Sequence, residues 1–248
     1  DANSFPSAND SVYIDSTLFT CNDMNWAAVT NNPIFYSTST NGILELYGSL
    51  TLSPVMTWSY YGTVNFKATA PGKTITCAMQ TLYYEIRFNG IGGEWTLQDP
   101  LNCGNLWLMN GVYYSNNQTI NCASFYGGIP SSSFSYLGTS TINCGGDWNA
   151  YSTFTTPNID ADSTVINLSG SNFLGGDIVY HYVNFLWGGN LSDRNTFDKV
   201  TTNGNFYING SNTFDTLYFN NPGGTVYISP TDTQFVNNSC YSHIEFFL

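Results

Sequence analysis

A short phrase that returns at a nearly constant interval is the feature that most constrains how this chain can fold. Thr-Ile-Asn-Cys occupies residues 119–122 and again residues 141–144, and 141 minus 119 is 22. Related phrases stand at residues 74–77 and 164–167, so the interval extends over several copies. Polar and apolar residues alternate within each copy, which is typical of a β-strand. A period of this length carried by strands indicates a solenoid, in which each repeat stacks on the next.

A second phrase, a short apolar strand closed by a small turn, runs beside the first. Four copies place an apolar residue at the same point, at intervals of 20, 22 and 20 residues: Leu46, Phe66, Phe88 and Leu108. Turn residues interrupt the strands about every ten residues, which is too often for strand–helix–strand units. We therefore predict an all-β fold, a right-handed parallel β-helix with coils of about 17–23 residues.

The second half of the chain keeps the pattern with a shorter period. Asn195–Val200 recurs as Asn212–Leu217, and 212 minus 195 is 17. Because both copies read Asn-Thr-Phe-Asp, we expect Phe197 and Phe214 to stack on each other in the core.

Two regions follow from these repeats. Residues 1–42 carry no clear copy and are expected to form a lead-in and a cap, with a short helix allowed only at 21–29. Residues 43–248 are expected to form the β-helix, with a bent joint or an excursion at 147–164. The final stretch, 243–248, is apolar with no polar cap, so we expect the β-helix to continue beyond it.

Charge excludes several classes of partner. Charged residues make up only 9% of the chain, against about 25% in an average soluble domain. The net charge is −12, and the five basic residues are scattered, so nucleic acid and anionic surfaces are excluded as partners. No apolar run reaches the about 18 residues that cross a bilayer, so no membrane-spanning segment is predicted. Surface glycans, proteins and divalent cations remain as partners.

Six cysteines raise the question of disulfides. Cys77, Cys122 and Cys144 share one repeat position, which favours a ladder of free, buried thiols. An even count in an exported-looking chain also allows at least one disulfide, and spacing alone does not decide between the two.

Aromatic side chains give the clearest signal for a ligand. They are 17% of the chain, and doublets such as Tyr60-Tyr61 must place one ring outside, because strand side chains alternate. Exposed rings beside amides and hydroxyls suit stacking on the apolar faces of sugars. The candidate ligand-binding aromatics are Trp58, Tyr60, Tyr113 and Trp187. The alternative is that outward rings only pack against the neighbouring strand.

Signals for catalysis and for metals are weaker. Glycoside hydrolysis needs two neighbouring carboxylates, for which Glu85 and Glu94 are the main candidates, beside Glu45 and Asp99. His181 lies in an alternating strand with no serine nucleophile motif, so it favours an exposed polar position. We predict no catalytic site, no metal centre and no cofactor. Calcium alone is weakly indicated, by Asp160–Asp162 and by residues 193–198.

Several stretches are similar to the repeats of a known class of proteins. They read Tyr-Gly-Ser-Leu-Thr-Leu at 47–52, Phe-Asn-Gly-Ile-Gly-Gly-Glu-Trp-Thr-Leu at 88–97, Ser-Thr-Ile-Asn-Cys-Gly-Gly-Asp-Trp at 140–148 and Ser-Asn-Thr-Phe-Asp-Thr-Leu-Tyr-Phe at 211–219. These resemble the repeats of very large adhesin-like surface proteins of gliding and related Bacteroidota, which the type IX secretion system exports. The resemblance covers most of residues 43–235 and carries no catalytic motif.

The resemblance implies a β-helix on the outer surface of the cell or in the medium. Its expected role is non-catalytic, as an adhesin or stalk segment of a longer type IX substrate, with the secretion or anchoring machinery as a partner. The alternative is a carbohydrate-binding or carbohydrate-active β-helix. Ice binding would need a regular threonine array, which the sequence does not repeat in register.

Overall fold

The structure is a computed structural model that describes residues 10–37, 39, 41–128, 133–150, 157–170, 172–220, 224–229 and 232–240. All regular structure in these ranges is β-strand. The first strands are β1 Val12–Ile14, β2 Leu18–Cys21, β3 Met24–Asn25, β4 Ile34–Ser37, β5 Ile43–Leu46, β6 Leu50–Thr51, β7 Thr57–Ser59, β8 Thr63–Phe66, β9 Lys73–Thr76, β10 Thr81–Leu97, β11 Leu101–Tyr114, β12 Ile120–Cys122 and β13 Ser124–Gly127. The later strands are β14 Ser133–Tyr136, β15 Thr141–Cys144, β16 Trp148–Asn149, β17 Asn158–Leu168, β18 Asn172–Leu174, β19 Val179–Phe185, β20 Gly189–Ser192, β21 Thr196–Thr202, β22 Phe206–Ile208, β23 Thr213–Phe219, β24 Val226–Ile228 and β25 Phe235–Cys240.

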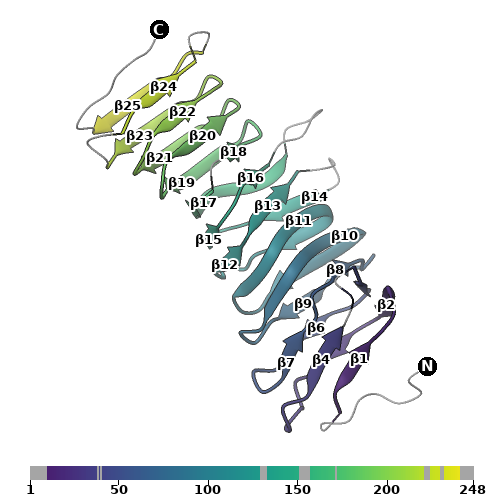
Figure 1. Ribbon diagram of the computed structural model, residues 1–248. Helices are drawn as coiled ribbons and strands as arrows, with labels where there is room; N and C mark the ends of the chain where they lie inside the picture. Colours follow the sequence, from purple (N-terminus) through teal and green to yellow (C-terminus); the bar gives the residue numbers. More distant parts are fainter. Residues whose placement is uncertain are drawn as a thin grey trace.

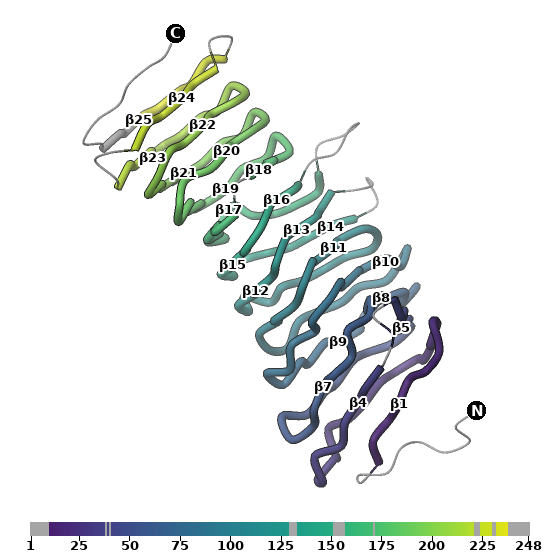
Figure 2. The backbone as a smooth tube through the Cα atoms, viewed as in Figure 1, coloured from purple at the N-terminus to yellow at the C-terminus, as the bar shows by residue number. Residues whose placement is uncertain are grey.

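Each coil pairs in parallel with the next, which makes an elongated stack (Figures 1 and 2). Coil length follows from the register: Val183 pairs with Val200, 17 residues later, and Trp148 pairs with Phe173, 25 residues later. The predicted parallel β-helix is therefore confirmed, with coils that reach slightly beyond the expected upper length. The longest coil spans the segment where the sequence indicated an excursion, and its residues 151–156 lie outside the described ranges.

Three faces make up each coil in the main stack. The first face holds β2, β5, β8, β13, β16, β18, β20, β22 and β24, with the middle parts of β10 and β11. The second face holds β3, β6, β9 and β14, with the ends of β10 and β11 and the starts of β17, β19, β21, β23 and β25. The third face holds β12 and β15, with the starts of β10 and β11 and the ends of β17, β19, β21, β23 and β25. At the N-terminal end, β1, β4 and β7 form a separate parallel sheet.

Long strands such as β10 and β11 bend from one face to the next without leaving the ladder. The register of β10 against β11 shifts between Leu82 and Glu85, where the chain turns from the third face to the first. Gly104 lies opposite this bend, and a Cβ there would stand 1.8 Å from the carbonyl oxygen of Tyr84. Only glycine allows the two coils to approach this closely.

The core consists of columns in which a side chain stacks on its equivalent one coil away. The rings of Phe125 and Trp148 lie 3.9 Å apart and 5° from parallel, and Phe173 continues this column. Phe197 and Phe214 stack at 5.3 Å and 10°, which confirms the prediction from their repeat. Full burial of one such side chain stabilises the fold by about 1.5–3 kcal/mol, so these columns supply most of the cohesion along the rod.

A ladder of asparagine side chains runs along the outside of the third face. From each coil to the one before it, a side-chain amide nitrogen donates to an amide oxygen, at 2.6, 2.7, 2.8 and 3.3 Å. Its members are Asn102, Asn121, Asn143, Asn167 and Asn184. Thr201 extends the ladder by donating its hydroxyl to Asn184 at 2.6 Å. The repeated Asn of the Thr-Ile-Asn-Cys phrase is therefore a hydrogen-bonding position between coils.

The N-terminal region departs from the prediction. Strands of the stack begin well before residue 43, because β2 pairs with β5 and β3 with β6. No helix forms at 21–29, where β2 ends and β3 lies. The side chains of Met24 and Trp26 are buried and give this irregular sequence a packed inner side, which the repeat search missed. The apolar end at 243–248 lies outside the described residues.

Within the described ranges, no helix has the length and apolar character that crossing a membrane requires.

Candidate functional site

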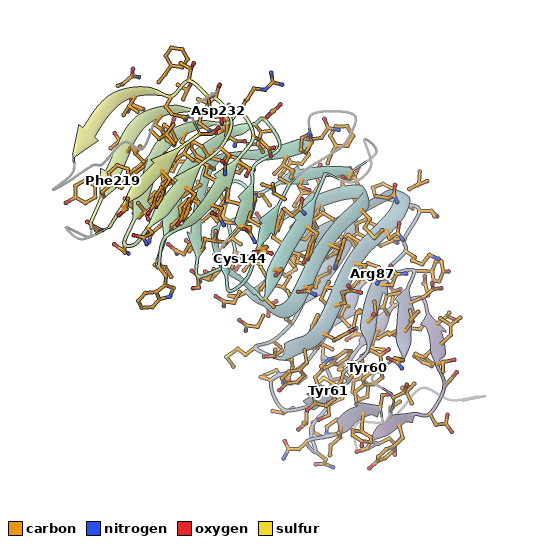
Figure 3. All side chains as sticks on the ribbon, turned by 45° about the horizontal axis from the view of Figure 1, so that its top comes forward. Tyr60, Tyr61, Arg87, Cys144, Phe219 and Asp232 are labelled. Atoms are coloured by element: carbon orange, nitrogen blue, oxygen red, sulfur yellow. The ribbon has the colours of Figure 1, made fainter. Side chains whose placement is uncertain are left out.

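The outer surface of the first face carries a strip in which charged and aromatic side chains follow one another from coil to coil. Register places its members in line along β5, β8, β10, β11 and β13: Glu45, Asn65, Arg87, Trp107 and Tyr126. We call these five residues the outer strip, and Figure 3 marks Arg87 within it. It is the longest run of mixed polar and aromatic side chains on the part of the surface that the structure describes.

Both carboxylates at the strip are held in ion pairs. Glu45 accepts from Lys67 at 3.1 Å and from the hydroxyl of Tyr47 at 3.0 Å. The hydrogen bond and the charge of Glu45 raise the pKa of Lys67, which keeps this ammonium protonated. Glu85 is paired with Arg87, two residues along the same strand. These pairings satisfy the carboxylates inside the chain, so neither is poised as a base.

The rings of the strip stack on each other. Trp107 and Tyr126 lie 4.0 Å apart at an angle of 10°. Three further pairs of outward rings do the same across neighbouring coils, at 4.4–5.0 Å: Tyr61 with Tyr83, Tyr114 with Tyr136, and Tyr207 with Tyr227. A stacked pair covers one face of each ring with its partner and turns the ring edges toward solvent. Sugars stack on ring faces, so these pairs fit cross-strand packing better than glycan recognition.

Three of the four aromatics predicted to bind ligand are inside the solenoid. Trp58 is 2% exposed, Tyr60 1% and Tyr113 2%. The expectation that they are exposed was therefore wrong. The doublets do place one ring outside, but it is the other member, Tyr61 or Tyr114 (Figure 3 marks Tyr60 and Tyr61). Strand alternation fixes that one ring points out, and only the register with the neighbouring coil fixes which.

Trp187 is the fourth predicted aromatic, and it is 78% exposed. It follows β19 at the corner between the third and first faces. The next residue, Gly188, has φ +94, and a Cβ there would stand 2.2 Å from the carbonyl oxygen of Asn205. Gly204 in the next coil packs equally closely on the carbonyl oxygen of Trp187, at 2.1 Å from its own Cβ position. This close backbone packing holds the turn, so the indole projects from a fixed base.

The carboxylates predicted as a catalytic pair are not brought together. Glu85 lies on the first face, whereas Glu94 lies on the second face, where it pairs with Val112. Asp99 accepts from the backbone N–H of Cys77 at 2.6 Å and of Ala78, so it caps a turn. The sequence pointed to these residues by their spacing along the chain, which says nothing about the face on which each lies.

His181 and the aspartates have structural partners as well. The Nδ1 atom of His181 lies 2.9 Å from the carboxylate of Asp198, one coil further on. Asp193 accepts from the N–H of Gly176 at 2.9 Å. Burial, followed by the charge of Asp162, raises the pKa of Asp160. Across the described ranges, no three His, Cys, Asp or Glu side chains come together as ligands for a metal ion, so the two weak calcium signals find no site there.

Comparison of the chain with protein-family models, with curated proteins and with solved structures found no match.

Proposed function

We propose that this chain is a rigid, non-catalytic segment of a secreted or cell-surface adhesin or stalk. It spans distance and bears load on the outside of the cell, and its low content of charged residues, 9%, is typical of exported β proteins. The likeness of its repeats to type IX adhesins supports that export route and a link to surface anchoring or gliding.

The observation that carries the proposal is the continuous bonding between coils on every side of the rod. Backbone ladders, core columns, the asparagine ladder and the outward ring pairs all connect one coil to the next. The polar and aromatic groups on the outside, which in an enzyme would face substrate, here satisfy one another along the axis. Such a body resists bending and pulling, because deformation breaks several kinds of contact at each coil.

Pulling the chain by its two ends in a single-molecule force experiment tests this role. We expect stepwise unravelling at high force, in which loss of one coil of about 20 residues lengthens the chain by about 70 Å. Smooth extension at low force, without steps, would contradict a load-bearing role. The same preparation, incubated with neutral polysaccharides, should release no new sugar ends. Cleavage that disappears in Glu85→Gln would overturn the non-catalytic part.

Recognition of a neutral glycan is a second candidate function, and Trp187 favours it. Among the described residues, its indole stacks on no other ring and is open on a fixed turn, which suits the apolar face of a sugar. Trp187→Ala should weaken binding on a neutral-glycan array by about tenfold or more, which corresponds to about 1.4 kcal/mol. Tyr207→Ala is the matched control, since that ring is exposed but stacked on Tyr227. Equal binding by both variants and the parent would remove Trp187 as a ligand contact.

A further inference from the structure

Three thiols stand on consecutive coils at the corner between the third and first faces. Cys122 on β12 and Cys144 on β15 are direct partners in the register of the two strands. Cys103 on β11 follows Asn102, whose partner Asn121 directly precedes Cys122. All three thiols are free and buried, with 9%, 6% and 1% exposure for Cys103, Cys122 and Cys144. Neither the rod nor the glycan role uses them.

The separation between Cys122 and Cys144 matches a disulfide. Partners on neighbouring parallel strands stand about 4.8 Å apart, the strand spacing, and disulfides join Cα atoms about 4.4–6.8 Å apart. Both side chains point to the same side, inward, so the two sulfur atoms share one column. The Cys122 thiol hydrogen-bonds to the Cys144 sulfur, so the two side chains are already in contact.

Small molecules have a way in at this corner. A shallow, open hollow of about 390 Å³ lies over the thiols, and its walls include Asn102, Asn121, Asn143 and Gly145. The corner residues that border it are small: Gly104, Ala123 and Gly145. Figure 3 marks the position of Cys144 midway along the rod. A low-molecular-weight disulfide can therefore approach the column without unfolding of the coils.

We propose that Cys122 and Cys144 are a redox-active pair that forms a disulfide across two coils when the protein meets an oxidising environment. The oxidant is a small disulfide such as oxidised glutathione. The Cys144 thiolate attacks one sulfur of that molecule, which forms a mixed disulfide and releases one small thiolate. The Cys122 thiolate then attacks the Cys144 sulfur and releases the second. Two protons and two electrons leave the protein, and the small disulfide is reduced to two thiols.

Electrostatics at the pair assign these two roles. The shared hydrogen bond lowers the pKa of Cys144 and raises that of Cys122, which burial raises further. Burial likewise raises the pKa of Cys103 above its ordinary value. Cys144 is therefore the thiol most readily deprotonated, and its partner is the in-register neighbour. The inference extends the proposed function, because oxidising conditions are those outside the cell.

Peptide mapping of the folded chain after equilibration with oxidised and reduced glutathione tests the pair. Remaining thiols are alkylated under denaturing conditions, and chymotrypsin is used because Arg87 and Arg194 leave all three cysteines in one tryptic peptide. Chymotrypsin cuts at the aromatic residues and leucines between them, which separates Cys103, Cys122 and Cys144. We expect a Cys122–Cys144 linked peptide, with the two alkylated peptides falling about tenfold from the reduced sample.

Serine variants provide the controls. Cys122→Ser and Cys144→Ser should each abolish the linked peptide, whereas Cys103→Ser and Cys77→Ser should retain it. Recovery of all three cysteines as alkylated thiols at every glutathione ratio would overturn the proposal, as would a link between Cys103 and Cys122. The map of the parent chain decides the matter even if a serine variant fails to fold. Neither outcome bears on the force steps that test the rod, so failure of one proposal is distinct from failure of the other.

Discussion

Removing one amide from the middle of the asparagine ladder should cost twice as much as removing one from its end. Asn143 donates to Asn121 at 2.7 Å and accepts from Asn167 at 2.8 Å, so Asn143→Ala breaks two hydrogen bonds. Asn102 stands at the N-terminal end of the ladder and accepts one ladder bond, from Asn121 at 2.6 Å. A hydrogen bond contributes a net of about 0.5–1.5 kcal/mol, which gives about 1–3 kcal/mol for Asn143→Ala and about half of that for Asn102→Ala.

Urea unfolding of the parent and the two variants measures this difference. Both positions are half-buried, so loss of side-chain packing is similar and Asn102→Ala is the matched control. The denaturant slope has to remain the same in all three proteins, since a changed slope reports lost cooperativity instead of lost stability. Equal costs for the two variants, or a cost below about 0.5 kcal/mol for Asn143→Ala, would refute the view that the ladder holds the coils together.

Three further predictions concern single positions. Gly104→Ala should destabilise the fold far more than Gly72→Ala, because the first Cβ meets a carbonyl oxygen at 1.8 Å and the second, at φ +81, meets nothing within 4 Å; thermal unfolding of both variants compares them. Tyr180→Phe should lower the free energy of unfolding by about 1–3 kcal/mol, since its hydroxyl accepts from the Trp148 indole and donates to the carbonyl of Gly175, and both would lose their partner. Asp162→Asn should lower the pKa of Asp160, measured by NMR titration. In the parent, protonated Asp160 contributes stability that is fully present below pH 3.8 and is lost as the pH rises through its raised pKa, so Asp162→Asn should reduce this loss.

The fold was predictable because the information lies in the period of the sequence. The interval between the two Thr-Ile-Asn-Cys copies equals the register of β12 on β15, in which Ile142 pairs with Ile120. Stacking of equivalent positions then follows directly, as it did for Phe197 and Phe214. The N-terminal coils were missed because their strands are only two to four residues long and carry no copy of the phrase. There, pairing with the next coil determines the structure, and local pattern does not.

The candidate ligand residues were less predictable, and the tyrosine doublets show why. A doublet states that one ring is outside, but bulges and bends shift the phase of alternation between one strand and the next. In β11, whose register shifts ahead of Val112, Tyr113 faces the core and Tyr114 faces out. The outer strip was missed because its members are one coil apart and follow no motif. The register of the coils brings Arg87 beside Trp107, and an inspection for aligned outward residues at the repeat interval could have found the pair.

Distances between labelled coils test the central claim, that the chain is one stiff rod of stacked coils, most directly. Spin labels introduced by non-thiol chemistry at Asn105 and, in turn, at Asn172, Asn190 and Tyr207 lie in one outward line on the first face, three, four and five coils apart. At about 4.8 Å per coil, the account predicts narrow distributions near about 14, 19 and 24 Å. Distances that do not grow by a constant step, or distributions that broaden with each added coil, would contradict it.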